Sequence, residues 1–193
     1  MTMTINRLSA ASAAAVLTAA ALAFPASASA AANSSVTSIP SPQGDIEMHV
    51  SADCAGTQCT FNTQANLLTP DGPIGFPGDA WARQTITLRS SNKDTWQEAS
   101  YSAPAGMPRE IKGSNHDNVL SKLYRSINKV EISATYFGGG PIERFRIEGV
   151  STPTDWRTGQ PNTKDEFIIC SVIQVVFGGV NLTTPTACTQ TRF

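Results

Sequence analysis

Apolar and polar residues alternate one by one along several stretches of this chain. The alternation occurs in four segments, which are 45–50, 85–89, 130–136 and 144–148. Because successive side chains of a β-strand point to opposite faces of its sheet, a period of two predicts half-buried strands. A fifth segment, 167–177, is apolar on both faces and rich in β-branched residues, which predicts a central strand. We therefore expect a chain built mainly from β-strands.

Clusters of glycine and proline separate these segments, and one stretch follows a different period. Between 119 and 127 the apolar residues recur at the spacing of one helix face, and Asp117 carries a charge that favours a helix N-terminus. This pattern predicts one short helix over about 117–128. Short strands joined by glycine and proline turns, with a single helix, favour an antiparallel β-sandwich or flattened barrel.

The first 30 residues have the order of parts that is typical of a secretory signal peptide. Arg7 supplies a positive charge, the apolar run 10–24 ends before Pro25, and small residues at 26–30 offer sites for a signal peptidase. The apolar run is shorter than the roughly 20 residues of a permanent transmembrane helix. We therefore expect a secreted, extracellular bacterial protein with no membrane anchor after cleavage.

The residues that follow the leader are expected to form one domain. Residues 31–44 are rich in serine, proline and small residues, which predicts a flexible lead-in to a β-rich domain over 45–193. One of the 14 basic residues, Arg7, lies in the leader, so the domain keeps 13 against 15 acidic residues. This weak negative charge argues against a nucleic-acid partner, because phosphate binding depends on clustered Lys and Arg.

Four cysteines follow the leader. An even number in an exported chain predicts two disulfides, and three pairings are possible. The spacing favours Cys54 with Cys59 and Cys170 with Cys188. It provides neither the grouped thiolates of a zinc site nor a redox Cys-x-x-Cys motif. We therefore expect a disulfide-stabilised domain with no metal and no cofactor.

Two histidines limit any histidine-dependent chemistry to His49 and His116. His49 shares a predicted strand face with Asp45 and Glu47, where it could form an acid–base pair or oppose charges on a neighbouring strand. His116 precedes Asp117, in a setting that suits an oriented imidazole or ordinary helix capping. We interpret both first as structural residues and second as catalytic candidates.

Glutamates supply the remaining catalytic candidates. Glu143 and Glu148, with Arg144, Arg146 and one histidine, are the residue types that a small secreted ribonuclease could use. Motifs of serine hydrolases, zinc proteases and nucleotide-binding proteins are absent from the sequence. The three glycines at 138–140 suit an oxyanion loop, but without a nucleophile motif we interpret them as a mobile or sharply turned hairpin.

The segment 69–81 combines three prolines and three glycines with aromatic residues. A restrained loop of this kind can bind sugars or proteins through its rings, or the rings can plug one end of the sandwich. Trp156, in a second turn, could extend such a surface. The binding hypothesis therefore predicts that Phe76, Trp81 and Trp156 lie exposed on one surface.

Disulfides, a β pattern and missing catalytic motifs together favour a non-catalytic secreted binding or interaction protein. Its expected partner is a cell-envelope polysaccharide or another extracellular protein. The alternative is a small extracellular hydrolase acting on a polymer, of nuclease or glycosidase type. A histidine in a cleft, within hydrogen-bonding reach of a carboxylate, would favour the enzyme.

Overall fold

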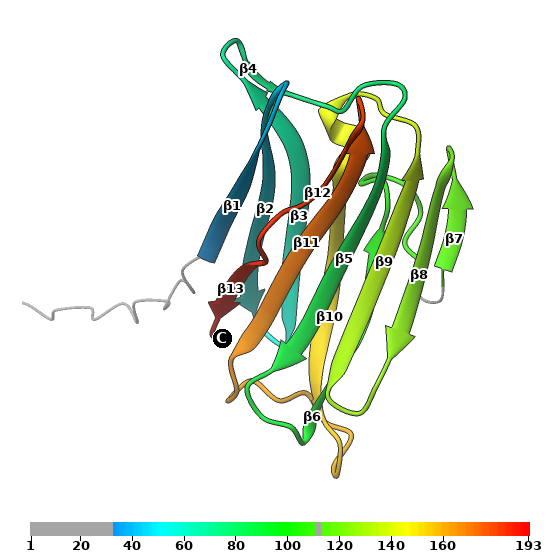
Figure 1. Ribbon diagram of the computed structural model, residues 1–193. Coiled ribbons are helices and arrows are strands. Elements are labelled where there is room, and N and C mark those ends of the chain that lie inside the picture. Colours follow the sequence, from blue (N-terminus) through cyan, green and yellow to red (C-terminus); the bar gives the residue numbers. More distant parts are fainter. Residues whose placement is uncertain (1–32, 111–112) are drawn as a thin grey trace, which may run out of the picture.

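The computed structural model describes residues 33–110 and 113–193, which form two antiparallel sheets packed face to face (Figure 1). Sheet A has the order β1 (Asn33–Ser41), β2 (Gly44–Ala55), β3 (Gln58–Thr69), β10 (Arg146–Asp155), β6 (Thr95–Ser102), with β4 (Gly72–Ile74) beside β3. Sheet B has the order β12 (Val180–Thr183), β11 (Phe167–Phe177), β5 (Trp81–Ser90), β9 (Lys129–Phe137), β8 (Val119–Arg125), β7 (Gly113–His116), with β13 (Ala187–Thr191) also beside β11. The expected mainly β, sandwich-like fold is confirmed, and 167–177 is a central strand.

The inner faces of the two sheets meet in one hydrophobic core. Side chains alternate between buried and half-buried along β2 and β11, and aromatic residues such as Phe145 and Phe167 are fully buried. Buried Gln84 bridges the sheets, because its Nε2 donates to Thr63 Oγ1 at 2.8 Å and its Oε1 accepts from the Tyr136 hydroxyl at 3.3 Å. A buried amide without partners would be costly, so this bridge fixes how the sheets face each other.

Both expected disulfides are confirmed. Cys54–Cys59 joins directly paired residues of β2 and β3, and Cys170–Cys188 joins directly paired residues of β11 and β13. The disulfides indicate an extracellular or otherwise oxidising environment. Within 33–110 and 113–193, no helix is long and apolar enough to cross a membrane.

The predicted helix over 117–128 is wrong. These residues contain the turn and the second strand of a hairpin formed by β7 and β8. Asp117 and Asn118 occupy the turn with φ values of 47° and 55°, which short polar side chains tolerate in two-residue hairpins. Buried Val119 points inward, whereas Leu120 and Tyr124 are exposed on the outer face. Because apolar residues lie on both faces of this strand, their spacing along the sequence resembles that of one helix face.

The flexible lead-in predicted over 31–44 is also corrected, because residues 33–41 form β1. This strand pairs with β2 along its whole length, from Asn33 opposite Ala52 to Ser41 opposite Gly44. It also reaches sheet B, since Thr37 Oγ1 donates to the Pro185 carbonyl at 2.7 Å. The expected signal peptide over 1–30 lies outside the described residues.

Candidate functional site

A row of polar side chains crosses four strands on the outer face of sheet A. Ser34 lies opposite Ser51, Ser51 lies opposite Asn62, and Asn62 lies opposite Glu148. Because neighbouring strands are about 4.8 Å apart, the row extends about 14 Å from β1 to β10. The intervening side chains of β2, β3 and β10, such as Phe61, are buried and those of β1 are half-buried, so the row faces away from the core.

Two adjoining hollows follow this row, and together we call them the sheet A trough. Their volumes are about 340 Å³ and about 320 Å³, and they share Ser51 and Asn62. Beside the four residues of the row, the trough is lined by outward-facing Val36, His49, Asp53, Thr60, Gln64 and Arg109, and by Ser35, Val50, Ala52, Phe61 and Gly149. Hydroxyl, amide and charged groups lie among apolar surface in this lining, so the trough offers hydrogen-bond donors and acceptors beside apolar contacts.

The charged groups of the trough differ in how they are satisfied. Glu148 Oε1 accepts from the Gly106 N–H at 3.3 Å, and its Oε2 accepts from Arg146 Nη2 at 3.3 Å. Asp53 Oδ1 and Arg146 Nε are buried and have no hydrogen-bond partner among the described residues. Buried atoms such as these are out of reach of a ligand. The half-buried Glu148 carboxylate, by contrast, lines the trough and is open to a hydrogen-bonding ligand.

His49 joins Glu148 as a catalytic candidate that lies in the trough. Its Nε2 is 3.1 Å from Glu47 Oε2, and Asn66 Nδ2 donates to the same oxygen at 2.9 Å. Arg146 and Glu148 lie on the same outer face, two strands away. Three residue types considered for polymer hydrolysis are thus brought to one face. Within the described part of the chain, no hydroxyl nucleophile hydrogen-bonds to His49.

The other two catalytic candidates lie elsewhere. His116 is on β7 in sheet B, and its Nε2 is 3.1 Å from Glu110 Oε1 in the connection that follows β6. Glu143 is exposed in the 3-10 helix η1 (Ile142–Phe145), at one end of the sandwich. The structure therefore does not combine Glu143 with Glu148 in one site.

The aromatic candidates do not share one surface. Phe76 is only 3% exposed and packs edge-on against Phe145, with ring centroids 4.8 Å apart, so the expectation that it is exposed is wrong. Trp81 is half-buried at the start of β5, on the outer face of sheet B, between Phe137 and Val176. The ring at 76 therefore plugs the sandwich, while Trp81 contributes to a different face from the trough.

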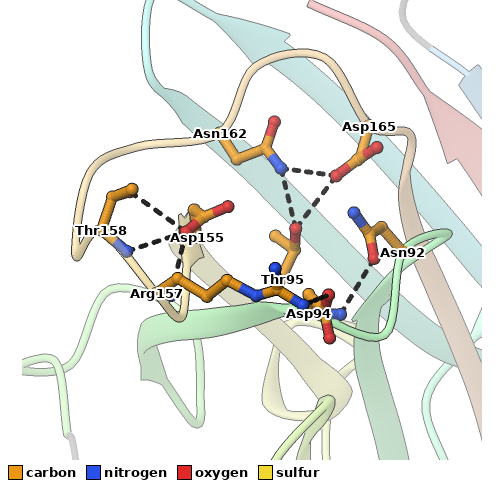
Figure 2. A network of polar contacts seen from close by, with 8 residues as sticks. All are labelled: Asn92, Asp94, Thr95, Asp155, Arg157, Thr158, Asn162 and Asp165. Atoms are coloured by element: carbon orange, nitrogen blue, oxygen red, sulfur yellow. Dashed lines mark hydrogen bonds and ion pairs between the residues drawn. The ribbon is translucent and has the colours of Figure 1, made fainter.

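Trp156 lies at the opposite end of the sandwich from Trp81. It is 66% exposed. Its backbone N–H donates to the carbonyl of Asp94, in the turn that follows β5, at 2.9 Å. Figure 2 shows the polar network beside it, where Arg157 pairs with Asp94 and Asp155 accepts from Thr158. The hydrogen bond from the Thr158 N–H lowers the pKa of the Asp155 carboxyl. We interpret this network as structural, because it holds the loop after β10 to the turn before β6.

The three glycines at 138–140 form a close backbone junction. Their N–H groups donate to carbonyls within 76–80. A Cβ on Gly139 would lie 1.8 Å from the Pro77 carbonyl oxygen, so only glycine fits there. These donors are occupied, whereas an oxyanion hole needs donors aimed at the substrate. β9 belongs to sheet B and the next strand, β10, belongs to sheet A, so 138–140 leads from one sheet to the other and does not form the expected hairpin.

Several trough residues were not anticipated from the sequence. Asp53 continues the alternation that begins at 45, so a longer reading of that period would have placed it beside His49 on one face. Asn62 and Gln64 also alternate with buried neighbours along β3. Arg109 comes from a connection without any period. The local sequence pattern does not show which strands pair, and it is this pairing that aligns these side chains in one row.

Comparisons with known proteins do not indicate a function for this chain. No protein-family model matches the chain, and no curated protein matches it. Among solved structures, it is similar to the membrane-inserted form of the NetB toxin of Clostridium perfringens, at 7% sequence identity. That alignment covers 83% of this chain and 94% of the toxin chain, with a TM-score of 0.23. A likeness this weak carries no argument about fold or function.

Proposed function

We propose that this chain is an exported protein that binds a polysaccharide in the sheet A trough. The observation that carries the proposal is the continuous polar row of Ser34, Ser51, Asn62 and Glu148 along the two hollows. Sugar hydroxyls both donate and accept hydrogen bonds, so they can pair with the hydroxyl, amide and carboxylate groups of the row. A row about 14 Å long, three strand spacings, suits an extended polymer.

The composition of the trough favours a sugar over a protein partner. Protein interfaces depend on buried aromatic and arginine anchors, and serine is depleted in them. In the trough, Val36 is the exposed large apolar side chain, and the other outward-facing groups are polar. Asp53 and Glu148 outnumber Arg109, so the trough also lacks the positive charge that a nucleic acid needs.

Export is part of the proposal and has two supports. The leader over 1–30 has the charge, apolar run and small residues of a signal peptide. The two disulfides fit an oxidising compartment. A binding protein outside the cell would meet envelope polysaccharides directly.

The test is affinity electrophoresis of oxidised 31–193 against neutral glucans, mannans and arabinogalactans, followed by calorimetry on the polymer that retards it. Asn62→Ala combined with Gln64→Ala should weaken binding about tenfold, since two hydrogen-bonding amides at about 0.7 kcal/mol each contribute about 1.4 kcal/mol. The matched control is Asn181→Ala, which removes an exposed amide from β12 on the other sheet. Absence of binding, or an equal effect of the control, would contradict the proposal.

Hydrolysis is the second candidate, and the hydrogen-bonded His49–Glu47 pair on the trough favours it. If the trough cleaves its polymer, wild-type protein should release reducing ends from the polysaccharide it binds. His49→Asn should then abolish release while binding persists, because the asparagine cannot transfer the proton. No product from wild type would exclude hydrolysis of that polymer and leave the binding proposal intact.

A further inference from the structure

A pocket of about 470 Å³ lies at one end of the sandwich, apart from the trough lining. Its walls come from three connections and η1: the segment after β6, the turn between β7 and β8, and the glycine-rich segment after β9. Pro104, Met107 and Pro141 make one part of the wall apolar. Asp117, Glu143 and Arg144 supply charge to the rest.

Arg144 is an unusual residue to find in this wall. Its side chain is only 10% exposed, and Nη1 donates to both the carbonyl and Oδ2 of Asp117, each at 2.7 Å. Nε is buried without a partner, and no described residue accepts a hydrogen bond from Nη2. Because Nε is out of reach, Nη2 is the guanidinium nitrogen that can donate a charge-assisted hydrogen bond to a ligand carboxylate.

The glycine-rich segment makes room for this arginine. A Cβ on Gly140 would lie 2.8 Å from Arg144 Cδ, so a side chain at 140 would displace the arginine stem. The backbone N–H of Gly140 is already bound to the Phe76 carbonyl at 2.9 Å, which keeps the segment in place above the arginine. The pocket wall is thus held by the same backbone junction that closes this end of the sandwich.

The charges of the wall define the ligand. Asp117 neutralises most of the charge of Arg144, and Glu143 is exposed beside them. A doubly charged anion such as phosphate would be repelled by two carboxylates, whereas a ligand with one carboxylate and one ammonium group matches both signs. The apolar part of the wall requires an apolar body on the same ligand. These three features together describe an α-amino acid with an apolar side chain, or a short apolar peptide.

We propose that this pocket binds such a zwitterion. The carboxylate accepts a hydrogen bond from Arg144 Nη2, and the ammonium group pairs with Glu143. The apolar side chain contacts Pro104, Met107 and Pro141. This site is independent of the trough, so each can fail without the other.

The test is a titration of isotope-labelled 31–193 with leucine, read by backbone amide shifts at 139–144. Leucine amide lacks the carboxylate and 4-methylpentanoate lacks the ammonium group, and both should bind about tenfold more weakly than leucine. Dileucine distinguishes the two sources of this chemistry, since a peptide site binds it more tightly than leucine and an amino-acid site does not. No saturable shift at millimolar leucine, or equal binding of the amide and the acid, would overturn the proposal.

Two substitutions separate binding from folding. Glu143→Gln changes an exposed side chain and should weaken leucine binding about tenfold without changing the melting temperature, while Glu98→Gln on sheet A should change neither. Arg144→Lys keeps the charge but loses the planar edge, and should also weaken leucine binding. Unchanged leucine affinity in a folded Glu143→Gln protein would overturn the proposed pairing.

Discussion

Gly139 decides whether the glycine-rich segment can close one end of the sandwich. An added Cβ would lie 1.8 Å from the Pro77 carbonyl oxygen and 2.2 Å from that of Phe76. Gly139→Ala should lower the free energy of unfolding by about 2 kcal/mol or more, because backbone must move. Gly78→Ala is the matched control, since nothing lies within 4 Å of a Cβ there. Equal urea midpoints for the two variants would contradict the described junction.

Tyr101 and Tyr136 hold hydroxyl groups in the core, and burial raises the pKa of both. A folded-state pKa above the ordinary value of 10.0 means that folding favours the neutral phenol. This stabilisation is therefore complete below pH 10 and is lost as the pH rises further.

An alkaline absorbance titration should show both residues ionising only as near-ultraviolet dichroism disappears. Tyr136→Phe should remove one phenolate from that step. Ionisation of all three tyrosines of the chain with the dichroism retained would contradict their placement.

Among the elements, β1 is the clearest case of a strand that the sequence pattern did not predict. Its inward residues are small and polar as well as apolar, so no period of two marks it, and its strand character comes from pairing with β2. A chain that starts at Gln43 should lose stability and self-associate, because β2 becomes an exposed edge. Thermal unfolding and light scattering measure both effects. Unchanged stability of a monomeric truncated chain would support the flexible lead-in.

Apart from 167–177, which is apolar on both faces, the strands predicted from the sequence share a clear difference between their two faces. In β2 and β9 the inward residues are apolar and the outward ones are mostly polar, so local pattern and tertiary burial agree. In β8 they disagree, because Leu120 and Tyr124 are apolar and exposed. The trough shows the same limit, since its residues come from strands whose order follows from pairing and not from any local pattern.

At the scale of the whole molecule, the two disulfides should contribute unequally. They span separations of 5 residues for Cys54–Cys59 and 18 for Cys170–Cys188. In the chain-entropy model, removing them as Ala pairs should cost about 2 and about 3 kcal/mol respectively. Chemical denaturation of the two double variants gives both values. A larger loss for the shorter loop would show that native packing, and not loop closure, dominates.

The central claim is that the outer face of sheet A binds a polysaccharide. The most direct measurement is a map of amide chemical-shift changes on 31–193 as a soluble fragment of the bound polysaccharide is added. We predict that the shifts concentrate at Ser34, Ser51, Asn62 and Glu148, along the row that crosses the strands. Shifts confined to the outer face of sheet B, around Trp81 and Phe137, would contradict the claim.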